Sequence, residues 1–288
     1  MAGRPGKHVL RFAGRVMQLW FFGEDRTAEL VDRSYDAISS GYDATWTSHM
    51  RDRTVELIDR LGVMGGQRAI DVTCGTGYAT NLVAERTGQT VVGVDRSGGM
   101  IAEARRQYGD RCEFVQSDIL DYLKDQPAES VDLVTCCWGL GYSRPRAVLG
   151  QIKRILRAGG TVGIIDNSIF SLSEVMRCSI LTFMEQPDKL ENIMRFRFLS
   201  GQRLLGLWMG LSGLKPIALW GGQKRYIATD GRQAIARLCA TGAAAGFEFA
   251  ASAADSPAVF ERFAEVIEKK YGNTIPIIHR YLAGIGRK

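Results

Sequence analysis

The chain of 288 residues lacks several features that mark whole classes of protein. It has no run of about 18 uncharged apolar residues, and its longest apolar stretch, residues 204–214, is too short to cross a bilayer as a helix. Arg11 and Arg15 interrupt the apolar N-terminal region and no small-residue cleavage site follows, so we expect no secretory signal. The six cysteines form no C-x-x-C pair and no metal-ligand spacing. We therefore expect a reduced, cytoplasmic protein without a bound metal.

The composition is that of a folded globular protein, with 45% hydrophobic and 24% charged residues. The net charge of +6 is unevenly distributed. Residues 1–22 carry four basic and no acidic side chains, residues 23–186 have a net charge of −5, and residues 187–288 have a net charge of +7. Basic flanks favour an anionic partner such as a phospholipid surface, a nucleic acid or a phosphate-bearing substrate, although a solvated basic surface without a partner is an equal alternative.

Residues 7–22 are predicted to form a basic amphipathic helix. Its basic and polar face carries Lys7, Arg11, Arg15 and Gln18, and its apolar residues are Phe12, Val16, Leu19 and Trp20. Four roles stay open for such a helix: it covers an active site, packs on a partner, docks on its own domain, or lies on an anionic membrane surface. We expect a peripheral membrane contact, if there is one, to be made here.

Short apolar strands alternate with helical segments from residue 68 to residue 166. This order predicts an α/β fold with a doubly wound, mostly parallel sheet, which binds ligands at the carboxyl ends of its strands. Helices are also expected over residues 173–185 and 190–214, a closing strand-helix-strand over 224–249, and a helical tail over 255–288. The predicted parts are an N-terminal helical or lid segment (1–50), a core (51–167), an inserted helical cap (168–222), and the closing part of the sheet with C-terminal helices (223–288).

The stretch AIDVTCGTGYAT permits two nucleotide-binding interpretations. Gly75, Gly77 and Thr80 approximate G-x-G-x-x-G, and Asp95 follows at the distance typical of a dinucleotide site. However, a carboxylate at Asp71 would repel a pyrophosphate beside this loop. The same carboxylate would attract a ligand that carries an ammonium and a sulfonium, as S-adenosylmethionine (SAM) does. The sequence therefore favours SAM.

Two further carboxylates follow the next two predicted strands. Asp95 is placed to accept hydrogen bonds from both ribose hydroxyls, and Asp118 from the exocyclic amine of adenine. Ile119 and Met100 are expected to provide apolar faces for the adenine ring. Each acid could instead cap a helix, but acids at three successive strand ends are a more specific pattern than the glycine loop alone.

From Tyr35 to about Asp166 the chain resembles the class I SAM-dependent methyltransferases, particularly those of ubiquinone and menaquinone biosynthesis. The motifs are AIDVTCGTGYAT, VVGVDRSGGMIAEA, FVQSDILDY and VDLVTCCWGLGYSRPRAVLGQIKRILRAGGTVGIID, preceded by SYDAISSGYD. The resemblance implies a Rossmann-like methyltransferase fold and SAM as cofactor, with S-adenosylhomocysteine as product. Together with the reasoning above, it predicts that the cofactor-binding residues are Tyr42, Asp71, Cys74, Gly75, Gly77, Asp95, Arg96, Met100, Asp118, Ile119, Cys136 and Trp138.

The resemblance assigns Tyr42 to the methionine carboxylate and the segment Cys136–Trp138 to the transferring methyl. Trp138 departs from the small apolar residues usual there. It could narrow the pocket, stack on the substrate or the sulfonium, or belong to the core. Methyl transfer is an in-line displacement that depends mainly on orientation, and the candidates for a catalytic base are His49, Tyr142 and Asp166.

The apolar segment at 204–211, with Phe183, Phe196 and Phe198, favours a small hydrophobic acceptor: a quinone precursor, polyketide, isoprenoid or lipid. The same residues could simply pack a helical cap. The chain has no Pro-Cys dipeptide, no Asn/Asp-Pro-Pro-aromatic tetrapeptide and no recognisable RNA-binding module, so we expect no nucleic-acid partner. Methylation of RNA or protein, cyclopropanation, aminopropyl transfer, a non-catalytic SAM-binding protein and a NAD-dependent oxidoreductase remain the alternatives.

Overall fold

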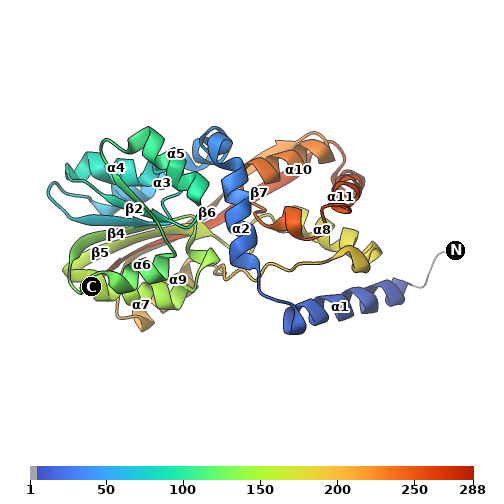
Figure 1. Cartoon of the computed structure of the whole chain (residues 1–288), viewed down its shortest axis with the longest axis horizontal. Coiled ribbons are helices and arrows are strands. Elements are labelled where there is room, and N and C mark those ends of the chain that lie inside the picture. The colour runs from blue at the N-terminus through green and yellow to red at the C-terminus, as the bar shows by residue number, and fades with distance from the viewer. Residues whose placement is uncertain (1–4) are drawn as a thin grey trace. The chain divides into compact units, whose positions relative to one another are not determined.

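The computed structural model describes residues 5–288, so the first four residues of the predicted 1–50 segment lie outside the described part (Figure 1). The chain divides into two compact units. The helical unit comprises residues up to Ser34, Leu172–Arg195 and Lys224–His279, and the sheet unit comprises Tyr35–Ser171, Phe196–Gln223 and Arg280–Lys288. This division differs from the predicted boundaries at 50, 167 and 222, which stay a prediction, and it assigns parts of the predicted cap to both units.

The sheet has seven strands in the order β3-β2-β1-β4-β5-β7-β6. Their bounds are β1 Ala69–Val72, β2 Val92–Asp95, β3 Glu113–Gln116, β4 Val131–Cys137, β5 Leu156–Asn167, β6 Lys215–Ala228 and β7 Ile275–Arg287. Strands β1 to β5 pair in parallel, and β7 runs antiparallel to β5. The prediction of an α/β fold with a mostly parallel sheet is confirmed. The chain order reverses direction beside β1, and a parallel sheet binds its ligands at such a point.

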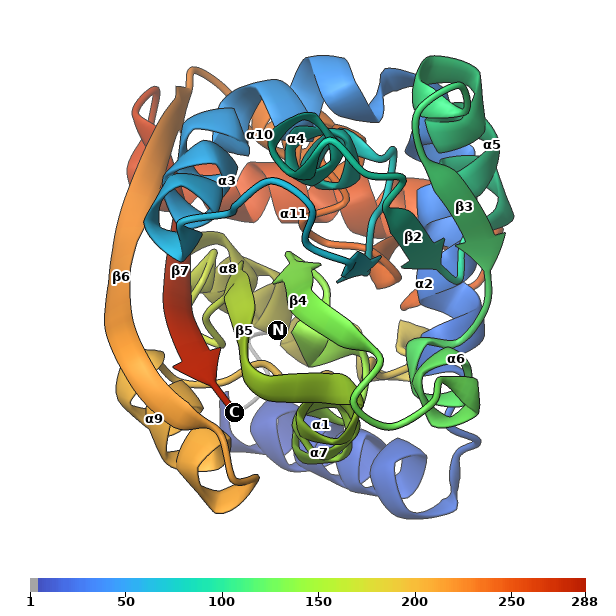
Figure 2. The ribbon, with the colours of Figure 1, turned by 90° about the vertical axis from the view of Figure 1, so that its left-hand side faces the viewer.

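Helices cover both faces of the sheet (Figure 2). One face carries α3 Ser48–Leu61, α4 Tyr78–Thr87 and α5 Gly98–Tyr108, and the other carries α6 Ile119–Asp125, α7 Pro145–Ile155 and α9 Gln202–Leu211. Buried side chains such as Val83 and Ile101 form the core on the first face, and Val148 and Leu205 belong to the core on the second. Burial on both faces explains why the strands are nearly continuous apolar runs.

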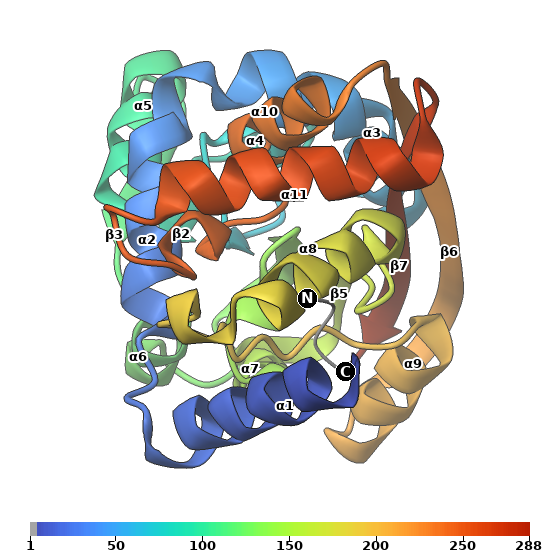
Figure 3. The ribbon, with the colours of Figure 1, turned by 90° about the vertical axis from the view of Figure 1, so that its right-hand side faces the viewer.

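The helical unit is built from α1 Pro5–Phe22, most of α2 Thr27–Ile38, α8 Ser173–Glu185, α10 Gly231–Ala240 and α11 Ser256–Tyr271. Helix α11 contacts both α8 and α10 (Figure 3), and Phe263 of α11 is almost completely buried among them. Arg195 donates to the carbonyl oxygens of Leu19, Trp20 and Gly23. Arg195 therefore satisfies the carbonyl groups that the end of α1 leaves without helical partners.

Three of the predicted elements are wrong. Of the predicted helix 190–214, only α9 is helical, and residues 190–199 have no regular structure. Residues 247–249 form a 3₁₀ turn in place of the expected strand. The expected helical tail ends with α11 at Gly272, whose φ of 62° stops the helix, and β7 follows. Residues 275–285 are rich in isoleucine and almost continuously buried, which favours a strand between two neighbours over an amphipathic helix.

Within residues 5–288, no helix is long and apolar enough to cross a membrane. In the same part of the chain, no cluster of His, Cys, Asp and Glu side chains is arranged to hold a metal ion.

Candidate active site

The glycine loop, residues 73–77, joins β1 to α4. Gly75 and Gly77 have φ values of 54° and 86°, which favour glycine because it has no Cβ. A Cβ on Gly77 would also lie 2.8 Å from the ring of Phe114. Thr73 has a φ of 66° without being glycine, and its hydroxyl donates to the carbonyl oxygen of Cys137 at 3.2 Å. The loop is therefore a fixed turn tied to the end of β4.

Asp95 ends β2 and is half-buried. One carboxylate oxygen accepts a hydrogen bond from Gly75 N–H at 2.9 Å and the other from Ser97 N–H at 3.0 Å. Burial raises the pKa of Asp95, against the opposing effect of these bonds. Each oxygen keeps a lone pair for a further donor. Asp95 thus fixes the glycine loop and can still accept from ligand hydroxyls.

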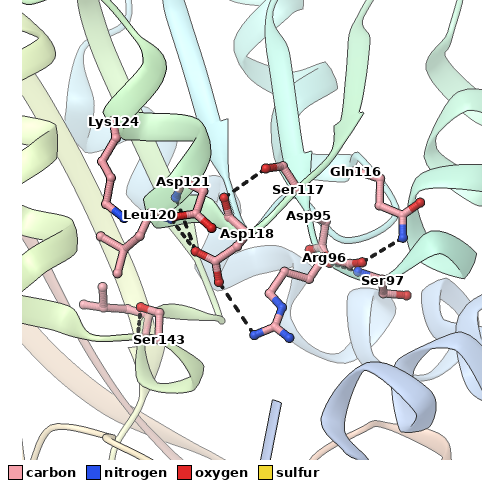
Figure 4. Close-up of polar contacts among 11 residues, drawn as sticks. Asp95, Arg96, Ser97, Gln116, Ser117, Asp118, Leu120, Asp121, Lys124 and Ser143 are labelled. Carbon is pink, nitrogen blue, oxygen red and sulfur yellow. Dashed lines mark hydrogen bonds and ion pairs between the residues drawn. The ribbon is translucent and has the colours of Figure 1, made fainter. Parts of the chain in front are cut away.

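Asp118 lies at the end of β3 and caps α6 (Figure 4). One oxygen accepts from Leu120 N–H at 2.8 Å, and the other lies 3.7 Å from a guanidinium nitrogen of Arg96. The capping role is therefore real, and the oxygen beside Arg96 is the one left to meet a ligand.

Ile119 and Met100 were predicted to provide apolar faces for the adenine ring. Ile119 is buried in the core on the α6 and α7 face of the sheet. Met100 is buried in the first turn of α5, where its N–H donates to Ser97 Oγ at 3.0 Å. Both side chains therefore present almost no surface, and their predicted contact with an adenine ring stays a prediction.

Asp71 is placed differently from the prediction. It lies within β1, has no exposed surface, and accepts hydrogen bonds from Thr135 Oγ1 at 2.6 Å and Thr80 Oγ1 at 2.7 Å. Burial raises the pKa of Asp71 to about 6, against these two bonds. The carboxylate joins β1, β4 and α4 and does not face a ligand. The argument that Asp71 binds the ammonium directly is therefore not supported.

Trp138 belongs to an aromatic cluster. Its indole N–H donates to Thr54 Oγ1 at 2.9 Å, and its ring meets Trp46 and Tyr281 edge to face at 5.5 and 6.1 Å. These contacts direct the ring toward α3 and β7, and Trp138 is half-buried against the core, so its predicted role at the site stays a prediction. Cys74 and Cys136 are buried and offer almost no surface to a ligand.

Three tyrosines meet at the carboxyl edge of the sheet. Tyr35 and Tyr142 share a hydrogen bond of 3.0 Å between their hydroxyls, and Tyr35 meets Tyr42 edge to face at 5.9 Å. The negative charge of Asp95 adds to burial in raising the pKa of Tyr42, so its phenol stays neutral near the carboxylate predicted to bind ribose. Phe196 and Phe198 pack edge to face on Tyr142. The sequence indicated Tyr42 and Tyr142 but missed Tyr35.

Asp166 is the next-to-last residue of β5, lies beside the turn that carries Tyr142, and is 3% exposed. Its oxygens accept from Gly141 N–H at 2.7 Å and Asn167 N–H at 2.8 Å. Burial raises the pKa of Asp166 to about 7, and its charge contributes to the raised pKa of Tyr142. The structure thus brings two of the three base candidates together. His49, the third, lies half-buried in the first turn of α3, and its role stays a prediction.

The sequence analysis did not single out two acids that contact the predicted site, Asp36 and Asp43. Asp36 accepts from Ser97 Oγ and Gly99 N–H, and Asp43 accepts from Thr76 Oγ1 in the glycine loop. A signal was present in the sequence, because the dipeptide Tyr-Asp occurs twice within SYDAISSGYD.

Residues 69–160 match the family described as a methyltransferase domain. The matched stretch contains the glycine loop, Asp95 and Asp118, and excludes Tyr42 and Asp166. This match covers less than half of the chain and lies within the sheet unit, and together with the sheet order it agrees with the class I, SAM-dependent methyltransferase fold expected there. The resemblance to this class is confirmed.

Several of the curated relatives are quinone methyltransferases by name, and others are trans-aconitate 2-methyltransferases. The chain is 34% identical over 145 residues to the demethylmenaquinone methyltransferase of Clavibacter sepedonicus, covering 48% of this chain and 58% of that protein. It is 31% identical over 150 residues to the 2-phytyl-1,4-naphtoquinone methyltransferase of Thermosynechococcus vestitus, covering 50% and 62%. The chain therefore spans about three fifths of these relatives. A putative methyltransferase of Bacillus halodurans shares the fold, with a TM-score of 0.57, 16% identity, and coverage of 82% and 98%.

The position of Asp71 generates a prediction about stability and pH. A pKa raised from 3.8 to about 6 means that the folded state disfavours the ionised carboxylate. The free energy of unfolding contributed by this group therefore falls as the pH rises from about 4 to 6, and stays constant at higher pH. Asp71→Asn removes the charge and keeps the shape. The gain in free energy of unfolding of Asp71→Asn over the wild type should be larger at pH 8 than at pH 4 by about 2 kcal/mol.

Denaturant unfolding at both pH values measures this difference, and titration with S-adenosylhomocysteine at pH 8 is the companion measurement. We expect Asp71→Asn to bind within about threefold of the wild type. A tenfold loss of affinity, or a stability difference independent of pH, would contradict the buried, structural role of Asp71.

Proposed function

We propose that the chain is a SAM-dependent methyltransferase that acts on a small hydrophobic acceptor of the quinone type. The observation that carries the proposal is the arrangement at the ends of β1 and β2, where Asp95 holds a glycine loop with positive φ angles and keeps acceptor capacity for ligand hydroxyls. These residues fit SAM, whose ribose needs an acceptor for two hydroxyls and whose methionine end needs close backbone approach.

SAM supplies an electrophilic methyl group on a sulfonium when it is bound. This chain would bind and orient it through the glycine loop, Asp95 and Tyr42, with Asp118 and Arg96 at the far end of the site. Orientation alone is worth roughly 7–11 kcal/mol of the barrier when the reacting atoms are aligned.

Tyr142 and Asp166 are the groups that could handle a proton of the acceptor. A carboxylate with a pKa of about 7 changes its protonation state near neutral pH, as a general base requires. A quinol-type acceptor must lose a hydroxyl proton before or during attack by its ring carbon. Tyr142 lies against Phe196 and Phe198, so an aromatic acceptor would find both apolar rings and a hydroxyl there. The names of the quinone methyltransferase relatives support the same acceptor class.

Binding of S-adenosylhomocysteine tests the cofactor. Calorimetric titration should show binding to the wild type, no binding of NADH, and an affinity at least about tenfold weaker for Asp95→Ala, because ligand hydroxyls lose their charged acceptor. Binding of NADH alone would overturn the proposal. An unchanged affinity in Asp95→Ala would remove Asp95 from the site.

The role of Asp166 is tested by the pH dependence of methyl transfer to a short-chain naphthoquinol, followed with labelled SAM. If Asp166 accepts the proton, kcat/KM should rise with pH and level off above about 7, because only the ionised carboxylate acts as a base. Asp166→Asn should lose about 10²- to 10⁴-fold in rate together with this pH limb. A variant that keeps the limb would assign the base elsewhere.

We further propose that α1 lies on a membrane surface from which a lipophilic acceptor is drawn. Phe12, Val16 and Leu19 pack against their own unit, so one face of α1 docks as an ordinary amphipathic helix does. Another face, with Leu10, Met17 and Phe21 at helical spacing, is apolar and 58–74% exposed. The helix carries no acidic residue. An exposed apolar face beside basic residues is typical of helices that lie in an anionic interface.

Co-sedimentation with anionic vesicles tests this contact. Replacing Leu10, Met17 and Phe21 with serine should weaken binding by about tenfold or more, since buried apolar area drives such contacts. The matched control replaces Met64, Leu207 and Leu211, which are similarly exposed on the sheet unit, and should bind as the wild type does. Equal binding by both triple variants would exclude α1 as the membrane contact.

A further inference from the structure

The segment Tyr35–Thr47 is attached to the cofactor side of the sheet unit at two points. Near its start, Asp36 accepts from Ser97 Oγ at 2.6 Å and from Gly99 N–H at 2.8 Å, in the turn between β2 and α5. Near its end, Asp43 makes the second attachment. Tyr42 lies between the two acids, and so does the 3₁₀ turn Ser39–Gly41.

Asp43 connects three elements through one carboxylate. One oxygen accepts from Thr76 Oγ1 at 2.6 Å and from Thr47 Oγ1 at 2.7 Å, and the other accepts from Gln107 Nε2 of α5 at 2.6 Å. Thr76 lies between the two glycines of the loop, so Asp43 is bonded directly to the turn that would surround the methionine end of SAM. Residues Asp43–Thr47 form a π-helical turn, a rare conformation that recurs at functional sites.

The first attachment depends on a close approach of two backbones. A Cβ built on Gly99 would lie 2.9 Å from the Cα of Asp36 and 2.9 Å from Ser39 Oγ. No side-chain rotation removes a clash with a Cα, so any larger residue at 99 must displace the segment. Gly98, one residue earlier, faces only the end of the exposed Gln116 side chain at 3.2 Å. An added methyl group at position 98 therefore meets only a flexible side chain, whereas at position 99 it meets the backbone of the segment.

We infer that Asp36 and Asp43 are positioning residues, which hold the segment 35–47 over the cofactor site and so set the affinity for SAM through Tyr42 and the glycine loop. This inference rests on the proposed function. The chemistry is ordinary: a carboxylate accepting three hydrogen bonds from neutral donors is a strong tie that needs no cation, and losing it leaves Tyr42 without a fixed place beside Asp95.

The pair Gly99→Ala and Gly98→Ala tests the first attachment. Both changes add one methyl group in the first turn of α5, with the same effect on helix propensity. Gly99→Ala should weaken S-adenosylhomocysteine binding by about tenfold or more, and Gly98→Ala should bind within about twofold of the wild type. Equal affinities for the two variants would overturn the role given to Asp36.

Substitutions at Asp43 test the second attachment. Asp43→Ala should raise the KM for SAM by about tenfold with little change in kcat, and should increase hydrogen exchange of residues 36–47 in the ligand-free protein. Asp43→Asn keeps an oxygen for Thr76 and should restore most of the affinity. Asp59→Ala, which breaks an exposed ion pair between α3 and α4, is the control for the loss of an acid and should change neither quantity.

The outcomes separate this inference from the function on which it rests. If the wild type does not bind S-adenosylhomocysteine, the proposed function fails. If the wild type binds and Asp43→Ala has the same KM, affinity and exchange, the function stands and the positioning role is wrong. A loss of kcat without a change in KM would also contradict it.

Discussion

The hydrogen bond from Gly75 N–H to Asp95 joins the ends of two neighbouring strands. A loop with two positive-φ glycines has little conformational preference of its own, because glycine loses more backbone freedom on folding than other residues. The carboxylate at the end of β2 supplies the fixed acceptor that selects one conformation. Thr73 secures the same loop to β4, and Asp43 secures it to the segment before α3. The geometry of the site is thus set from three sides, each through one short hydrogen bond.

The sheet unit was largely predictable from the sequence, because its signals are local. Strand β1 leads into the glycine loop, β2 ends at Asp95, and Asp118 follows β3, so the pattern alone places both acids at the carboxyl edge of the sheet. What the pattern does not contain is the direction of a side chain. Asp71 is one residue inside β1. Because successive side chains of a strand point to opposite faces, the Asp71 carboxylate points toward β4 and α4, where it accepts hydrogen bonds from Thr135 and Thr80. Trp138 follows β4 with a φ of 66°, a local twist that no periodicity reveals, and its ring joins Trp46 and Tyr281.

The helices of the helical unit were largely predicted, but their assembly was not, since its segments come from three distant parts of the chain. Arg195 is one example: its contact with the end of α1 joins residues about 175 positions apart, and no pattern around either position indicates it. Strand β7, which pairs with β5 in the sheet, was also hard to predict. Its sequence is mostly apolar and buried, and such a run is compatible with a buried helix or a strand until the neighbours are known. In both cases the structure is determined by tertiary packing and not by the local sequence pattern.

Asp71 and Asp166 are two buried acids on adjacent parts of the same sheet, and their hydrogen bonds distinguish their roles. Asp71 takes hydroxyl donors from two other elements, so its carboxylate is enclosed by the packing that it joins. Asp166 takes N–H donors of Gly141 and Asn167 only, and its charge is felt by Tyr142 at the edge where an acceptor would bind. Both ionised forms are disfavoured by burial. At Asp71, the cost of burying the carboxylate occurs where the side chain joins β1 to β4 and α4. At Asp166, the same cost raises the pKa to a value at which a proton can be taken up and released near neutral pH.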